Sequence, residues 1–207
     1  MLITPSIMET FKWELNKVNY KEYWDKINEQ NGILHSLYSS YWDKYSDFST
    51  WQFWVILLSL LLPLLILYFV VDRKRLFEIF FFGYTVHLFW AYTDIALSRG
   101  TYLTHTYFLF PLLPSASNIT GSFLPVGFLL VYQYATNHKK NFYILTILLS
   151  AANAFIFANI EEAVGLVTFH KGFNSFHLFL LDLVIVFVAY WFTRLMLKFR
   201  IHTKEEA

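Results

Sequence analysis

The 207-residue chain contains no cysteine and comparatively few charged residues, and each shortage narrows what it can be. A chain without cysteine has no disulfide, no thiolate nucleophile and no cysteine-ligated metal. Charged residues make up 15% of the chain, whereas a soluble domain carries about 25%. The formal net charge is only +1, so no global field attracts nucleic acid or other polyanions. The composition therefore argues against a soluble enzyme, a nucleic-acid binder and a disordered chain.

The usual catalytic signatures are missing as well. The sequence has no HExxH, GxSxG, GxxxxGK[ST] or CxxC motif, so no established spacing indicates an enzyme or a bound cofactor. No internal repeat is evident, and the inverted-repeat signature of many transporters is therefore lacking. Residues 1–30 mix charged and apolar side chains instead of joining a basic start to an apolar stretch, so we expect no signal peptide there.

What the chain has in excess is apolar and aromatic side chains, with 57% hydrophobic residues that include 23 Phe. About 20 mostly apolar residues cross the roughly 30 Å of a bilayer core. The stretches that approach this length are the predicted spans, at 53–71, 76–97, 119–136, 142–169 and 175–197. Pro63 lies in the middle of the first span and should kink it. The sequence thus predicts an all-α integral membrane helical bundle with five transmembrane helices over 53–198, surrounded by lipid and followed by a cytoplasmic tail at 199–207.

The apolar spacing within residues 1–52 predicts amphipathic helices before the first span. The apolar spacing of Ile7, Phe11, Leu15 and Val18 indicates one helix, and Asn31-Gly32 is a suitable place for it to stop. A second apolar stripe follows, made of Ile33, Leu34, Leu37, Tyr38, Tyr41, Trp42 and Tyr45. Its many aromatic rings favour a helix lying in the membrane interface. A lid that binds a partner would show the same pattern and stays an alternative.

The segment 101–114 is apolar and aromatic but too short to cross a bilayer. Pro111 and Pro114 interrupt it further. Because irregular backbone at membrane depth must be buried in protein or hydrated, a position at the membrane surface is favoured over a re-entrant loop.

The distribution of Lys and Arg near the span ends predicts the orientation. Nine such residues fall on one side: Arg73, Lys74, Arg75, Lys139, Lys140, Arg194, Lys198, Arg200 and Lys204. Three fall on the other side, at Lys44, Arg99 and Lys171. The positive-inside rule then predicts a multi-pass protein of the cell membrane with its N-terminus outside and its C-terminus in the cytoplasm.

Ionisable residues inside the predicted spans are candidate functional residues, because they are costly at membrane depth unless paired or hydrated. Asp94 and His87 share a helical face with Gly83, Ala91 and Ser98. Small and polar residues mark the packing faces of membrane helices, so we expect this face to point into the bundle, with Arg99 as a partner for Asp94. Glu78, near the end of the same span, is interpreted as an end-of-helix ion pair with Lys74.

Two further spans carry acids. Ser150, Ala154, Ala158 and Glu162 form a ridge at four-residue spacing, which predicts that Glu162 points inward. Glu161 lies about 100° away around the helix, so its direction is less defined. Asp182 shares a face with Ser175, Val186, Ala189 and Thr193, which places it in the bundle interior.

The candidate intramembrane polar site therefore comprises His87, Asp94, Glu161, Glu162 and Asp182 in the outer half of the membrane, near His105, His170 and His177. The leading hypothesis is a non-enzymatic structural or assembly component whose acids hold the bundle together. A small solute, cation or proton translocator using Asp94, Glu162 and Asp182 is the alternative. A membrane-embedded enzyme, with a metal or a lipid beside Glu161 and Glu162, is the third reading.

The order of these features resembles a known family. The matching features are Asp72-Arg73-Lys74-Arg75, Glu78, Gly83, Asp94, Gly100, Tyr102, Pro114, Pro125, Val131-Tyr132-Gln133-Tyr134, Glu161-Glu162, Gly165 and Ser175-Phe176. Over residues 33–198 the chain resembles an uncharacterised family of small multi-pass membrane proteins found mainly in endospore-forming Gram-positive bacteria. The resemblance implies topology and a cell-membrane location, and it implies no activity. A homo-oligomer or a membrane protein partner stays open.

Overall fold

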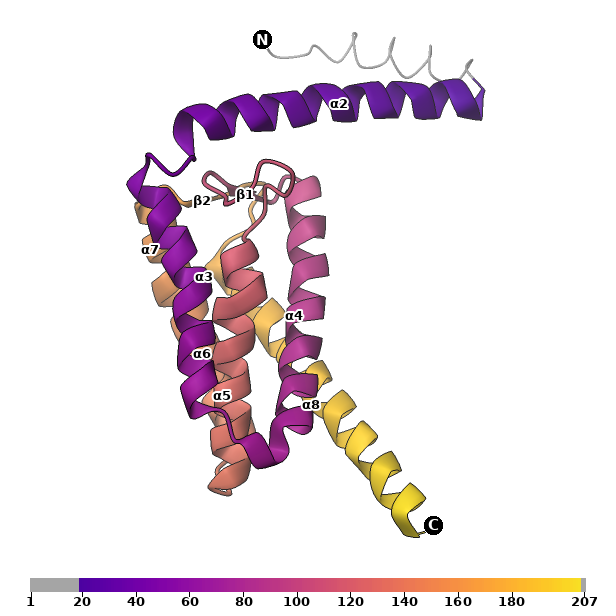
Figure 1. Cartoon of the computed structure of the whole chain (residues 1–207), viewed down its shortest axis with the longest axis vertical. Helices are drawn as coiled ribbons and strands as arrows, with labels where there is room; N and C mark the ends of the chain where they lie inside the picture. The colour runs from indigo at the N-terminus through magenta and orange to yellow at the C-terminus, as the bar shows by residue number, and fades with distance from the viewer. Residues whose placement is uncertain (1–18, 206–207) are drawn as a thin grey trace.

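The structure is a computed structural model that describes residues 19–205, and it is mostly helical (Figure 1). The predicted first amphipathic stripe, from Ile7 to Val18, lies outside the described residues. A bundle of long helices forms the body of the molecule, and helix α2 (Tyr20–Tyr45) lies across one end of it (Figure 1). We call this the α2 end and the other the Arg75 end.

Helix α2 is one continuous helix, so the predicted stop at Asn31-Gly32 is wrong. Asn19 begins the helix, because its side-chain oxygen accepts hydrogen bonds from the backbone N–H groups of Lys21 and Glu22, at 3.0 and 3.1 Å. A glycine inside a helix costs about 1 kcal/mol relative to alanine. A helix of 26 residues accommodates one such residue without breaking.

The second apolar stripe lies within α2, and its C-terminal part contacts the protein. Trp42 Nε1 and Ser46 Oγ both donate to the carbonyl of Phe108, each at 3.0 Å, and the Tyr38 ring meets Phe108 edge-on. Leu34 and Leu37 on the same helix are exposed. The apolar face of α2 is thus left partly open, and the interfacial helix and the partner-binding lid both stay predictions.

The bundle consists of α3 (Trp51–Val70), α4 (Leu76–Arg99), α5 (Leu124–Asn137), α6 (Phe142–Ala152), α7 (Ala158–Ala163) and α8 (Ser175–Glu205). The 3₁₀ turn η1 (Arg73–Arg75) precedes α4. The π-helical segments η2 (Ile119–Phe123) and η3 (Asn153–Phe157) precede α5 and α7.

Three described helices are long and apolar enough to cross a membrane: Trp51–Val70, Phe142–Ala163 and Ser175–Phe199. These correspond to the predicted first, fourth and fifth spans. The predicted second and third spans form helices, α4 and η2–α5, but they are not among the three. Glu78, His87 and Asp94 make α4 more polar, and the regular part of α5 is only 14 residues long. The five-span prediction is therefore supported for three spans.

Aromatic stacking joins α4, α5, α6 and α8 in the core. Phe82 stacks on Tyr132 with ring centroids 4.5 Å apart, and Phe142 stacks on Tyr190 at 4.4 Å. Phe82 and Tyr132 are fully buried. Gly83 lets α5 approach α4, because a Cβ at that position would lie 2.6 Å from Leu129 Cδ1.

The predicted fourth span extends too far, since the helix ends at Ala163 rather than at residue 169. Gly165 adopts φ +77°, a left-handed conformation that glycine takes without steric cost, and this turns the chain out of the helix. Strand β2 (Val167–Phe169) follows and pairs antiparallel with β1 (Leu103–His105), with Leu103 opposite Phe169. Neither strand is predicted from the sequence pattern. The pair lies at the α2 end (Figure 1), so the segment 101–114 does not cross the bundle.

At the Arg75 end, Glu78 pairs with Arg75 and not with Lys74, which corrects the predicted partner. Arg75 Nε donates to Glu78 Oε2 at 3.2 Å, and the Tyr132 hydroxyl donates to Glu78 Oε1 at 2.5 Å. Arg75 Nη1 also donates to Thr136 Oγ1 at 2.8 Å. The hydrogen bond to Glu78 raises the pKa of Arg75 above its ordinary value. This network ties the start of α4 to the end of α5.

Candidate functional site

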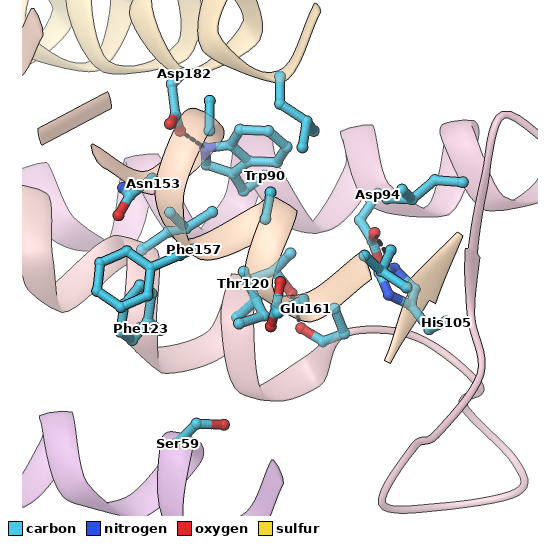
Figure 2. A pocket seen from close by; sticks show the side chains of 18 of the residues that line it. Ser59, Trp90, Asp94, His105, Thr120, Phe123, Asn153, Phe157, Glu161 and Asp182 are labelled. Atoms are coloured by element: carbon cyan, nitrogen blue, oxygen red, sulfur yellow. Dashed lines mark hydrogen bonds and ion pairs between the residues drawn. The ribbon is translucent and has the colours of Figure 1, made fainter. Parts of the chain in front are cut away.

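A cavity of about 270 Å³ lies near the α2 end, between α4, η2, η3, α7 and α8, with both strands contributing to its wall. Its apolar lining comprises Leu103, Ala116, Ile119, Phe123, Leu124, Ala154, Phe157, Ala158, Val167, Phe169 and Leu178. Its polar lining comprises Ser59, Asp94, His105, Thr120, Asn153, Glu161 and Asp182, together with Trp90. Figure 2 shows these polar side chains arriving from different elements. The cavity thus combines an apolar wall with a few polar groups, the arrangement typical of small-molecule sites.

Both π-helical segments contribute to this cavity. Segment η2 supplies Ile119, Thr120 and Phe123. Segment η3 supplies Asn153, Ala154 and Phe157. Because π-helical turns are rare and occur frequently at functional sites, their presence on two walls of one cavity singles it out from the rest of the bundle.

Asp94 pairs with His105, which corrects the predicted pairing with Arg99. The His105 Nε2 and Asp94 Oδ1 atoms are 2.7 Å apart, and Asp94 is 3% exposed (Figure 2). Five residues turn a helix by about 500°, so Arg99 projects some 140° away from Asp94 and is exposed. His105 reaches Asp94 because the chain turns back after α4 into β1. The second oxygen of Asp94, Oδ2, is buried without a hydrogen-bond partner among the described residues.

Asp182 pairs with Trp90 across the bundle. Trp90 Nε1 donates to Asp182 Oδ1 at 3.0 Å, and Asp182 is 2% exposed (Figure 2). This bond links the N-terminal part of α8 to α4. The nearby Asn153 Oδ1 is buried and accepts no hydrogen bond from the described residues.

Glu161 lines the cavity, whereas Glu162 is exposed and does not, so the predicted inward direction of Glu162 is corrected. The π-helical segment η3 (Asn153–Phe157) lies between Ser150 and Glu162. Because a π-helix has i→i+5 hydrogen bonds and a different number of residues per turn from an α-helix, the four-residue ridge predicted from Ser150 does not continue to Glu162. The Glu161 carboxylate interacts electrostatically with His105 and has no hydrogen-bond partner within the described part of the chain.

His87 lies beside the cavity rather than in its wall. Its Nδ1 is 2.7 Å from the carbonyl oxygen of Thr120, which links α4 to η2. Of the predicted site residues, Asp94, Glu161 and Asp182 line the cavity, and His87 and Glu162 do not. His105 is predicted from the sequence only as a neighbour of the site, and Trp90 is not among the predicted site residues. Trp90 lies four residues before Asp94. That spacing puts both residues on the same helical face, and it could have indicated that Trp90 also points into the bundle.

No group of three or more His, Asp and Glu residues within 19–205 could hold a metal ion. The acids of α4, α7 and α8 therefore share a cavity without forming a coordination sphere. The arrangement offers separate hydrogen-bond acceptors to a molecule inside it.

Comparisons with protein-family models, with curated proteins and with solved structures give no match to this chain.

Proposed function

We propose that this chain is a multi-pass membrane protein with five spans, N-terminus outside and C-terminus in the cytoplasm. The support is the packing of α4 and η2–α5 alongside the three helices that are long and apolar enough to cross (Figure 1). At about 1.5 Å per residue, the 24 residues of α4 are also long enough. The basic residues of η1 and of the α5–α6 turn gather at the Arg75 end, as the positive-inside rule requires of a cytoplasmic face. The family resemblance implies the same five-span topology, and membership of that family is likewise a proposal.

Within this topology the leading function is a non-enzymatic structural or assembly component whose buried acids hold the helices together. The hydrogen bond from Trp90 to Asp182 carries this proposal, since it joins α4 to α8 in the interior. Asp94–His105 and His87–Thr120 extend the same pattern from α4 to β1 and to η2. Each of these polar groups connects α4 to a different element.

The substitution Trp90→Phe tests the structural role. It keeps a six-membered aromatic ring, removes the N–H-bearing half of the indole and leaves the buried Asp182 Oδ1 without this donor, which costs about 1–3 kcal/mol. We expect a lower melting temperature for the purified variant in detergent, followed by intrinsic or dye fluorescence. Trp191→Phe is the matched control, because Trp191 is exposed and its Nε1 donates to the hydroxyl of Tyr143, which is also exposed. Equal melting temperatures for the two variants would remove the support for a network that holds the bundle.

The cavity favours a second candidate, a membrane protein that handles a small solute or cation. The specific observation is that Asp94, Glu161 and Asp182 come from three helices and line one space. Glu162, a member of the predicted translocation set, is replaced in this proposal by Glu161.

A further inference from the structure

Three polar side chains that line the cavity carry hydrogen-bond acceptors without a donor among the described residues. Asp94 Oδ2 and Asn153 Oδ1 are buried and accept nothing from the described residues. The Glu161 carboxylate also has no donor there. An ionised carboxylate can only accept hydrogen bonds, and a buried acceptor without a donor is costly. A molecule that fills this cavity well must therefore supply donors, and a positive charge would match the carboxylates.

The remaining wall selects for an apolar body. Phe123, Phe157 and Phe169 present aromatic rings, and Leu178 adds an aliphatic side chain. Aromatic faces also attract organic cations. A cavity of about 150 Å³ accepts a benzene molecule, so the 270 Å³ here has room for a substituted aromatic ring but not for a phospholipid.

We infer that this cavity binds a small amphiphilic organic cation, a protonated amine carried on a compact apolar body. The amine would lie beside Glu161, on the side of the cavity where Asp94 and His105 lie, and the apolar body would extend toward Phe123 and Phe157 on the other side (Figure 2). A bare metal ion fits less well, because hard cations take several oxygen ligands at once and the described residues offer no cluster of three.

A groove of about 580 Å³ between α2 and residues 104–108 lies next to the cavity. Leu34, Leu37 and Tyr41 form part of its apolar side. His105 lines both the groove and the cavity, so the Asp94–His105 pair lies on the wall between them. An amphiphile that collects at the membrane surface under α2 would reach the cavity past this pair.

This inference rests on the solute-handling candidate and deepens it, but it requires binding only, not movement across the membrane. The test uses the full chain in detergent and equilibrium dialysis of radiolabelled 4-phenylbutylamine. We expect saturable binding of one amine per chain, with at least tenfold weaker affinity in Glu161→Gln.

Glu162→Gln is the matched control, because this neighbouring acid is exposed and outside the cavity. Ala158→Phe, which places a ring in the cavity, should abolish saturable binding.

Butylbenzene and 4-phenylbutyrate separate the cation from its apolar body. The wild-type melting temperature should rise with the amine and stay unchanged with the other two, a measurement that needs no variant. Equal stabilisation by butylbenzene, or equal amine affinity in Glu161→Gln and Glu162→Gln, would overturn the inference. Uptake of the amine into liposomes is a separate readout. Binding without uptake would leave the inference standing and remove the translocator, and uptake lost in Glu161→Gln would support both.

Discussion

Gly83 is a residue at which two helices depend on a missing side chain. A Cβ there would lie 2.6 Å from Leu129 Cδ1 and 3.3 Å from Leu129 Cβ, so Leu129 cannot escape by rotating its tip alone. Gly83→Val should destabilise the fold by about 1–3 kcal/mol, the usual cost of overpacking a core. Thermal unfolding of the purified protein in detergent measures the effect.

The same substitution at Gly32 provides the control. Gly32 lies within α2, and a Cβ there would meet nothing within 4 Å. Because valine has a higher helix propensity than glycine, Gly32→Val should keep or raise the melting temperature. A Gly83→Val protein as stable as Gly32→Val would show that α4 and α5 do not pack through this contact.

Single residues also show where sequence reasoning stops. Asp94 and Asp182 lie in the interior, on faces that the spacing of small residues marks. The choice between Glu161 and Glu162 could not be made from four-residue spacing, because the π-helical segment Asn153–Phe157 changes the helical register before these acids. The partner of Asp94 could not be read from helical spacing at all, since His105 reaches it only after the chain reverses into β1.

At the scale of elements, apolar runs predicted the starts of the helices more closely than their ends. Helices α4, η2, α6 and α8 begin at the predicted residues. The end of α7 was missed because Val164–Phe169 is as apolar as the helix before it, and only Gly165 signals the change. Strands of three residues are too short for a periodic pattern. The continuity of α2 was missed because Asn31-Gly32 is locally a good stop and yet is tolerated inside a long helix.

The turn at Gly165 offers an element-scale test, since it ends α7 and leads into β2. A side chain there meets no atom within 4 Å, so any cost is conformational and not steric. At φ +77° an L-residue pays about 1–2 kcal/mol, and Gly165→Ala should lower the free energy of unfolding by about that amount. Gly127→Ala within α5 is the comparison, because its Cβ would make an ordinary contact with Leu149 at 3.4 Å. A loss no larger than that of Gly127→Ala would argue against a left-handed Gly165.

At the scale of the whole molecule, composition alone predicted a membrane protein, and three helices support that reading. Whether α4 and η2–α5 cross the membrane is harder to predict from composition, because their polar residues make contacts inside the bundle. Asp94 and His87 lower the apolar character of α4, and both bond to neighbouring elements instead of facing lipid. The helices whose polar side chains connect the bundle therefore have the lowest apolar content, and composition identifies them least readily as membrane spans.

The number of spans can be tested directly, because the chain has no native cysteine. Single cysteines at Lys74, Thr101, Lys139 and Lys171 would each be exposed and would flank α4, η2–α5 and α6–α7 in turn. With five spans, a membrane-impermeant maleimide added to intact cells should label Thr101→Cys and Lys171→Cys but not Lys74→Cys or Lys139→Cys. All four should react after permeabilisation, which controls for accessibility. If only the three most apolar helices cross, positions 74, 101 and 139 lie on one side and must label alike, so Thr101 decides between the two topologies.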